Sequence, residues 1–331
     1  MDNYDKIGIN SVAELAGVSI TTVSRVINGS TLVSEKTKTA VFDAIEKLNY
    51  HPNVLARSLR KNKTNTIGVV VSNNTNPFFM SVVSGIEKTA NLMGYSIILC
   101  NSYEDSEKEE EHILRLLSYQ IDGYIVAATG SEPNWMRWLN NKPVVFIDRK
   151  PDNKTDFVYD TVMVDNVKGS RMAVNCLFSR GCRRIAFLNG SLRSSTGRER
   201  LEGFREAYSD NGLEFENEFV METSFLGNSV QEYAEKVLSD PKFDAVFTGN
   251  NLILQELLKV AKAKGMSFPR DKGLATFDDV DWLEYCESRI ISVRQPTFDI
   301  GVTAMKLLGS RMDGYEGKGR DVVLDASLIV R

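Results

Sequence analysis

Hydrophobic side chains in residues 9–49 recur at the spacing of short helices. Val23, Val26 and Ile27 fall at positions i, i+3 and i+4, which places them on one helical face. Ser19, a preferred N-cap residue, precedes them, and an Asn-Gly pair that favours helix ends follows them. The pattern predicts a short helix with one apolar face.

A second short helix is expected just before it. Residues 11–14 have the S-x-x-E form of a capping box, so this helix should start at Ser11. Gly17 should end it after less than two turns. Two short helices joined by a tight turn that contains glycine predict a helix-turn-helix.

The outer face of the second helix carries side chains suited to reading DNA. They are Ile20, Thr21, Thr22, Ser24 and Arg25. Methyl groups can contact thymine, hydroxyls can bond base edges or phosphates, and arginine can grip guanine with two hydrogen bonds. A third helix, capped by Ser34, should complete the head. An ordinary three-helix bundle with a polar outer face is the alternative interpretation.

Residues 54–63 mix leucine and alanine with arginine and lysine. The segment is too short to be a stable helix in isolation. It suits a linker that orders when its basic side chains meet phosphates and an apolar side chain enters a minor-groove step.

From residue 64 onward the pattern changes to short apolar runs separated by helix-length stretches. The runs predicted to be buried strands are Ile67–Val71, Ser96–Cys100, Gly123–Ala127, Val144–Ile147, Ile185–Leu188, Ala245–Phe247 and Leu274–Phe277. Helices are expected at about 78–93 and 105–119. Two blocks of alternating strand and helix predict two doubly wound α/β subdomains.

Polar and aromatic residues follow these runs, at the edge where doubly wound sheets bind ligands. They are Asn73, Phe78 and Phe79 after the first run, Asp148 and Arg149 after the fourth, Arg198 after the fifth, Asn250 after the sixth, and Asp278 after the seventh. Amides beside aromatic rings suit a polyol. Loop polarity or helix capping explains any one of them better, so only their recurrence at strand ends indicates a site.

Charge separates the two parts of the chain. Residues 1–63 hold nine Lys and Arg against six Asp and Glu, a net charge of +3, whereas the whole chain carries −4 and the remainder therefore −7. A basic head on an acidic body is typical of a polyanion-binding module joined to another domain. An ordinary solvated surface is the alternative.

Several function classes lack their signals. No run of 18 apolar residues and no apolar N-terminal segment occurs, so we expect a cytoplasmic protein with no membrane span. The four cysteines and two histidines show no metal-ligand spacing, which predicts reduced thiols, no metal and no cofactor. Sequence motifs of phosphate-binding loops and catalytic nucleophiles are absent, so an enzyme is not expected.

Four motifs cover the head: Val12–Ser19, Thr21–Gly29, Val33–Thr37 and Pro52–Leu59. Together they resemble the LacI/GalR family of bacterial transcriptional regulators. The resemblance implies that Ile20, Thr21 and Arg25 face base edges in the major groove. It also implies that Leu59, flanked by Ala56, enters the minor groove. Contacts to the DNA backbone are implied for Ser24, Asn28, Tyr50 and Arg57.

The body carries further landmarks: Asn76–Phe79, Phe146–Arg149, Val164–Asn166, Arg183–Leu188, Arg198–Phe204, Phe277–Asp279 and Val293–Pro296. They resemble the same family, whose core is similar to periplasmic sugar-binding proteins. The resemblance implies effector contacts from Phe78, Arg149, Arg198, Phe225, Asn250 and Asp278, with Asn73, Phe79, Asp148 and Gln295 as further candidates.

The resemblance also implies a division of the chain. Residues 1–53 would form the DNA-binding domain, 54–63 a hinge helix, and 64–331 the core that binds effector and dimerises. Within the core, one subdomain would span about 64–163 and 296–324. The other would span about 164–295 and 325–331.

The function expected is a homodimeric repressor that binds a pseudo-palindromic operator under the control of a small sugar-type effector and regulates carbohydrate catabolism. Arg149 and Arg198 facing one cleft could neutralise a carboxylate, which favours a sugar acid such as a ketogluconate; a neutral pentose or hexose is the alternative. A periplasmic binding protein would have no use for residues 9–60. A Rossmann-type enzyme would need a GxGxxG motif after Val71, where none occurs.

Overall fold

The computed structural model describes residues 8–50, 63–130, 134–139, 142–152, 157–268, 271–286 and 289–331. The chain divides into two compact units, Met1–Thr64 and Asn65–Arg331. Each has hydrophobic core clusters of its own. Residues 54–62 of the predicted hinge segment lie outside the described residues.

The described part of the first unit contains three helices, with α1 at Ile9–Ala16, α2 at Ile20–Ile27 and α3 at Glu35–Lys47. The predicted N-caps of α2 and α3 are confirmed. Ser19 Oγ accepts a hydrogen bond from the Thr22 amide at 3.1 Å, and Ser34 Oγ accepts one from the Thr37 amide at 3.3 Å.

The expected start of α1 was wrong. The helix begins at Ile9, after Gly8, whose carbonyl accepts from the Ser11 and Val12 amides at 3.0 and 3.4 Å. Ser11 therefore lies inside the first turn. Ile9 packs against the core of the head, so the longer helix buries an apolar side chain that the S-x-x-E pattern does not register.

Buried side chains from all three helices form the core of the head. They are Val12, Ala13, Val23, Val26, Val41 and Ala44. Gly17, with φ 64°, makes the turn between α1 and α2, a conformation that glycine adopts without strain. The apolar faces therefore hold α2 against α1 and α3 and leave its other face exposed.

The second unit contains two sheets of six strands among the described residues. The first has the order β11-β5-β4-β3-β1-β2, and all its neighbouring strands are parallel. Its strands are β1 Thr66–Val71, β2 Ser96–Asn101, β3 Gly123–Val126, β4 Val144–Ile147, β5 Asp160–Val164 and β11 Asp321–Leu324.

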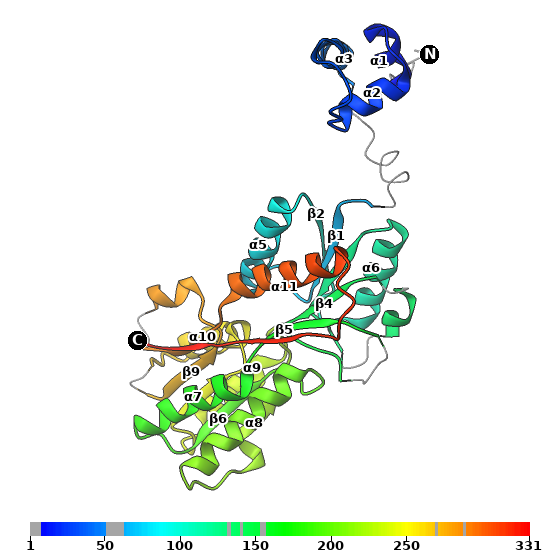
Figure 1. Cartoon of the computed structure of the whole chain (residues 1–331). Coiled ribbons are helices and arrows are strands. Elements are labelled where there is room, and N and C mark those ends of the chain that lie inside the picture. Colours follow the sequence, from blue (N-terminus) through cyan, green and yellow to red (C-terminus); the bar gives the residue numbers. More distant parts are fainter. Residues whose placement is uncertain are drawn as a thin grey trace. The chain divides into compact units, whose positions relative to one another are not determined.

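Helices cover both faces of this sheet. They are α5 Pro77–Leu92 and α11 Thr297–Met312 on one face, α6 Ser106–Ser118 on the other, and the short η1 Asn134–Trp138 beside α6. α5 and α11 lie side by side (Figure 1). Their contact is close because Gly85 and Gly301 face the partner helix: a Cβ on Gly85 would lie 2.2 Å from the Phe298 carbonyl oxygen.

The second sheet has the order β12-β10-β9-β8-β6-β7, with only β12 antiparallel to its neighbour among the described strands. Its strands are β6 Ile185–Asn189, β7 Val220–Glu222, β8 Ala245–Thr248, β9 Gly273–Phe277, β10 Ile291–Arg294 and β12 Ser327–Val330. Its helices are α7 Asn166–Ser179, α8 Ser195–Asp210, α9 Val230–Ser239 and α10 Asn251–Ala263, with the short η2 Asn217–Phe219 and η3 Asp281–Tyr285.

The predicted fold class is confirmed: a helical head is joined to a core of two doubly wound α/β layers. All seven apolar runs form strands. The sequence did not single out β5, β7, β10, β11 and β12. These strands are three to five residues long, and several carry polar side chains that depend on tertiary partners, so they lack a continuous apolar run.

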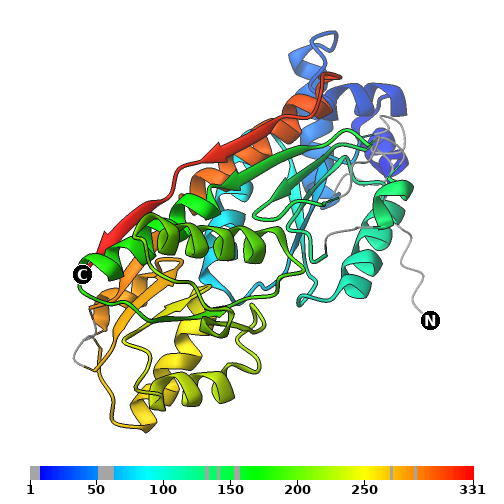
Figure 2. The same ribbon diagram turned by 90° about the horizontal axis from the view of Figure 1, so that it is seen from below.

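The chain passes between the two sheets three times, after β5, after β10 and after β11. The last passage is visible as the extended C-terminal segment that runs from one sheet to the other (Figures 1 and 2). Below, the N-subdomain denotes β1–β5, α5, α6, α11 and β11, and the C-subdomain denotes α7–β10 and β12. Three crossing segments therefore connect the subdomains.

Within the described residues, no helix is long and apolar enough to cross a membrane. The same residues contain no group of three or more His, Cys, Asp or Glu side chains that could hold a metal ion. The cysteines Cys100, Cys176, Cys182 and Cys286 are unpaired and partly buried.

Candidate functional site

The exposed face of α2 is the candidate DNA-reading surface of the head. Val23 and Val26 are buried, whereas Ile20, Thr21 and Arg25 are exposed, Ile20 to 45%. A large apolar side chain on a polar helix surface is suited to contact with a thymine methyl group. The structure therefore brings the three residues implied to face base edges onto one open surface.

The other predicted DNA-contacting residues have local partners or lie elsewhere. Thr22 Oγ1 lies 2.8 Å from Ser19 Oγ in the N-cap, and Asn28 Nδ2 donates to the Ser24 carbonyl at 2.7 Å and to its hydroxyl at 3.3 Å. Tyr50 packs against the head core. The predicted roles of Ala56, Arg57 and Leu59 fall on residues outside the described part of the chain.

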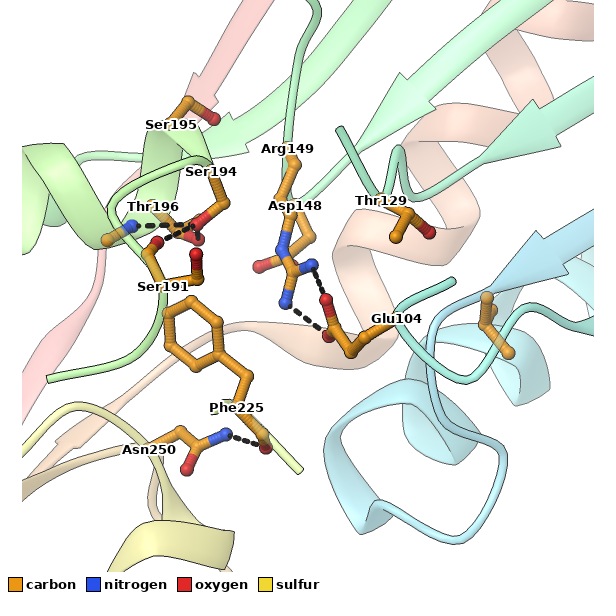
Figure 3. A network of polar contacts seen from close by, with 12 residues as sticks. Glu104, Thr129, Asp148, Arg149, Ser191, Ser194, Ser195, Thr196, Phe225 and Asn250 are labelled. Atoms are coloured by element: carbon orange, nitrogen blue, oxygen red, sulfur yellow. Dashed lines mark hydrogen bonds and ion pairs between the residues drawn. The ribbon is translucent and has the colours of Figure 1, made fainter. Parts of the chain in front are cut away.

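In the core, charged residues gather where the strands of the two subdomains end. Arg149, which follows β4, is only 4% exposed. Its Nη1 and Nη2 donate to the two carboxylate oxygens of Glu104 at 2.6 and 2.8 Å, and its Nε lies 3.3 Å from Asp148 Oδ2. On its other side the guanidinium lies 4.8 Å from the ring centre of Phe225 (Figure 3). Arg149 thus connects both subdomains.

The carboxylates beside it are strongly perturbed by burial. Burial raises the pKa of Asp148 to about 6, although Arg149 and Arg200 oppose the shift. Burial also raises the pKa of Asp278, whose Oδ1 accepts a hydrogen bond from Gln295 Nε2 at 2.6 Å. Burial lowers the pKa of Arg149, but Glu104 and Asp148 outweigh it and the pKa lies above its usual value.

Backbone strain marks the same place. Asp148 has φ 62° and Asp278 has φ 71°, in the left-handed region that non-glycine residues adopt only when their surroundings require it. Tyr103 and Glu104 share this conformation, with φ 55° and 58°. Strained residues cluster at functional sites, so these loop positions support a ligand site at the strand ends.

Arg200 was missed by the sequence reasoning. It is 3% exposed, donates from Nε to Asn166 Oδ1 at 2.9 Å and from Nη1 to the Gly249 carbonyl at 2.5 Å, and lies 3.8 Å over the Phe277 ring. Burial lowers its pKa, against the attraction of Asp278 and Asp148. A helical period could have found it, because residue 200 shares a face with the buried Phe204.

Arg198 points elsewhere. Its Nη1 donates to the Leu192 and Arg193 carbonyls at 3.0 and 3.1 Å, and its Nη2 donates to Asp152 Oδ1 at 2.5 Å. Its side chain is 40% exposed. Arg149 and Arg198 are therefore engaged by different carboxylates, Glu104 and Asp152.

Several predicted effector residues have structural partners of their own. Asn73 Oδ1 accepts from the amide and hydroxyl of Thr75 at 2.9 and 2.7 Å, which forms a turn. Asn250 caps α10 and donates from Nδ2 to the Phe225 carbonyl at 2.9 Å. Phe78 and Phe79 are buried with their ring centres 4.9 Å apart, edge to face.

A group of hydroxyl side chains at the start of α8 was also missed. Figure 3 shows Ser191, Ser194, Ser195 and Thr196 across from Arg149. Ser194 Oγ donates to the Ser191 carbonyl at 2.9 Å and accepts from the Gly197 amide at 3.1 Å. The Ser-Ser-Thr run ahead of Arg198 was the available sequence signal.

A cavity of about 460 Å³ adjoins this network. Its walls come from both subdomains: Pro77, Phe78, Ser81, Asp278, Asp279, Val280, Asp281, Trp282, Tyr285, Gln295 and Thr297. The volume lies in the range of small-molecule sites. Across the subdomain boundary, Asn251 Nδ2 donates to Asn76 Oδ1 at 3.1 Å. Among the predicted site residues, Phe78, Asp278 and Gln295 are thus brought together here.

Comparison with known proteins gives consistent matches along the chain. Residues 8–53 match the family described as bacterial regulatory proteins, lacI family, and residues 64–283 match periplasmic binding proteins and sugar binding domain of LacI family. The HTH-type transcriptional repressor PurR of Photobacterium profundum is 31% identical over 98% of this chain and 97% of its own length.

Two solved structures with bound sugars are also similar. The complex of the transcriptional regulator CelR with cellobiose is 31% identical, with a TM-score of 0.74 over 98% of this chain and 99% of its own. A LacI family transcriptional regulator from Enterococcus faecium with bound ribose is 25% identical, with a TM-score of 0.71 over 80% of this chain and 96% of its own. Both similarities include the two-sheet core.

Proposed function

Because this chain belongs to the lacI family of bacterial regulatory proteins, it is a DNA-binding transcription regulator rather than an enzyme, and we propose that it is a homodimeric repressor. We propose that a neutral sugar controls its binding to the operator, either by releasing the repressor or by holding it there. We propose further that it acts in the cytoplasm and controls genes of carbohydrate catabolism.

The head supports the DNA part of this proposal. The exposed α2 face with Ile20, Thr21 and Arg25 is short, so a single head reads few bases. A two-fold dimer presents two such faces to a pseudo-palindromic site. The positive charge of residues 1–63 adds contacts to phosphate that carry no sequence information.

The ion pair between Arg149 and Glu104 carries the choice of a neutral effector. Glu104 occupies the Nη1/Nη2 edge of the guanidinium, which could otherwise bind a ligand carboxylate at two points. Asp148 lies 3.3 Å from the Nε of the same arginine, and Arg198 is paired with Asp152. These two arginines therefore do not favour a sugar acid. The hydroxyls around Ser194 and the acceptor oxygens of Asp148 and Asp278 can bond to the hydroxyl groups of a sugar. Two similar structures hold neutral sugars, cellobiose and ribose, which supports the same choice.

The crossing segments supply a route from effector to DNA. Gln295, which lies between β10 and α11, is hydrogen-bonded to Asp278 at 2.6 Å, so the site is tied directly to one of the three connections. An effector that favours one arrangement of the subdomains over another would couple to the head. A coupling of about 1–3 kcal/mol changes operator affinity roughly 5- to 150-fold.

Two measurements test the proposal. Selection from a DNA pool with a randomised central segment should yield a pseudo-palindrome that the purified dimer shifts in a gel. The midpoint temperature of thermal unfolding should then rise when cellobiose, ribose or another neutral sugar is added. The same sugar should change the affinity for the selected DNA in the gel shift. Failure to select any specific DNA would contradict the repressor role, and stabilisation only by sugar acids or by a nucleobase would contradict the neutral sugar.

A further inference from the structure

Glu104 is the side chain that neutralises Arg149. Its carboxylate oxygens accept from Nη1 at 2.6 Å and from Nη2 at 2.8 Å, the two-point geometry that makes arginine–carboxylate pairs strong. The two residues come from different loops, after β2 and after β4, and face one another (Figure 3). An effector carboxylate that needed Arg149 would have to displace this internal one.

The loop around Glu104 sets the position of its carboxylate. Tyr103 and Glu104 are two consecutive non-glycine residues in the left-handed region, a conformation that persists only when neighbouring contacts impose it. The Tyr103 amide donates to Asn101 Oδ1 at 3.3 Å, and the Asp105 amide donates to the Ser102 carbonyl at 3.0 Å. Asp105 in turn caps α6. The carboxylate is thus held in place by the fold itself.

Further negative charge surrounds the pair. Asp148 Oδ2 lies 3.3 Å from Arg149 Nε, and Asp278 is close enough to Asp148 to oppose its ionisation. The side chains of Glu104 and Asp148 are only 17% and 8% exposed, so water screens these charges weakly. An anionic ligand would meet this negative charge with the Nη1/Nη2 edge of Arg149 already bonded to Glu104, whereas a neutral polyol can donate hydrogen bonds to the carboxylates.

We propose that Glu104 determines whether the site accepts a neutral or a negatively charged effector. By occupying the guanidinium of Arg149, it admits neutral sugars and excludes sugar acids. This inference rests on the proposed function, since it concerns the sugar-type effector of the same site. This role of Glu104 differs from that of a residue that only anchors its loop. Loss of an anchor would weaken the binding of all sugars alike and leave the preference between neutral and acidic sugars unchanged.

The test compares matched pairs of sugars on matched variants of the full chain. The probes are glucose with glucuronate and galactose with galacturonate, pairs that keep the pyranose ring and differ in the carboxylate at C6. Glu104→Gln removes the charge and keeps the shape, whereas Glu104→Asp keeps the charge. Glu111→Gln is the control, since Glu111 makes an exposed ion pair with Arg115 on α6. Calorimetry gives the affinities, and thermal unfolding verifies that each variant is folded.

Wild type, E104D and E111Q should prefer the neutral member of the pair that binds. E104Q should bind the acidic member at least tenfold more tightly than wild type does, while its affinity for the neutral member changes much less. A folded E104Q with the wild-type preference, or an E104D that gains the acid, would overturn the proposal. If E104Q does not fold, Glu104→Asn takes its place, because it also removes the charge, suits the left-handed backbone at this position, and must then bind the acid more tightly than wild type does.

The outcome also separates this inference from the proposed function. If wild type binds neutral sugars and the preference does not respond to Glu104, only the specificity role is wrong. If wild type binds the acid more tightly than its neutral partner, or binds neither member of any sugar pair, the neutral-sugar effector is wrong and this inference with it.

Discussion

Replacing Asp148 by asparagine should stabilise the core at neutral pH. The carboxylate is buried beside Arg149 and Arg200, yet burial raises its pKa to about 6 from an ordinary value of 3.8. Its charged form is therefore less favourable in the folded protein than in the unfolded chain. Asparagine has nearly the same shape and carries no charge, so it removes the cost of that ionisation.

The direction and size follow from proton linkage. Between pH 3.8 and about 6 the folded protein binds a proton on Asp148 that the unfolded chain has released. The wild-type contribution is therefore most favourable below pH 3.8 and is lost as the pH rises through 6. At about 1.4 kcal/mol for each pKa unit, the loss amounts to at most about 3 kcal/mol. The attraction between ionised Asp148 and Arg149 already contributes to this raised pKa, so it is not counted a second time.

Urea unfolding followed by tryptophan fluorescence measures the effect on the core, because all three tryptophans, Trp135, Trp138 and Trp282, belong to the second unit. The difference in unfolding free energy between Asp148→Asn and wild type should be about 1 kcal/mol at pH 4.5 and approach about 3 kcal/mol in favour of the variant at pH 7.5. Exchange of the exposed Asp313 for asparagine is the control. An equal difference at both pH values would refute the reasoning.

Three further outcomes can be checked. Arg25→Ala should weaken operator binding by about 1–3 kcal/mol in a gel shift and leave sugar binding unchanged, because its side chain lies on the exposed face of α2; equal losses on random DNA would contradict base reading. Gly85→Ala should destabilise the core by about 1–3 kcal/mol, since the new Cβ would lie 2.2 Å from the Phe298 carbonyl oxygen, whereas Gly130→Ala, with nothing within 4 Å, should not. Arg200→Met should destabilise the core by about 1–3 kcal/mol at pH 7.5, because it leaves the buried Asn166 Oδ1 and the Gly249 carbonyl without their donor; an unchanged free energy of urea unfolding would contradict a structural role for these hydrogen bonds.

Local sequence determined the secondary structure that depends on neighbours along the chain. Ser19 and Ser34 cap helices because their hydroxyls need only reach an amide three residues away. The seven apolar runs became strands because both faces of a parallel sheet are covered and such strands are apolar throughout. The alternation of these runs with helices was sufficient to predict the doubly wound fold.

Tertiary structure decided which charges meet. Glu104 and Arg149 are 45 residues apart, and no spacing rule relates the loop after β2 to the loop after β4. Arg198 and Arg200 are two residues apart on one helix, yet one pairs with Asp152 near the surface and the other is buried over Phe277. The positions of Arg149 and Arg198 after predicted strands suggested two arginines that face one cleft.

The short strands β5, β10 and β11 show the same division. Asp160 in β5 is fully buried and pairs with Arg311 and Arg320 at 2.6 and 2.7 Å, so a charged residue occupies a strand position that a local pattern rejects. Periodicity reflects the average environment along a segment, so it was sufficient to predict the two layers of strands and helices. Charge pairing depends on the few ångströms between side chains that only the folded chain brings together.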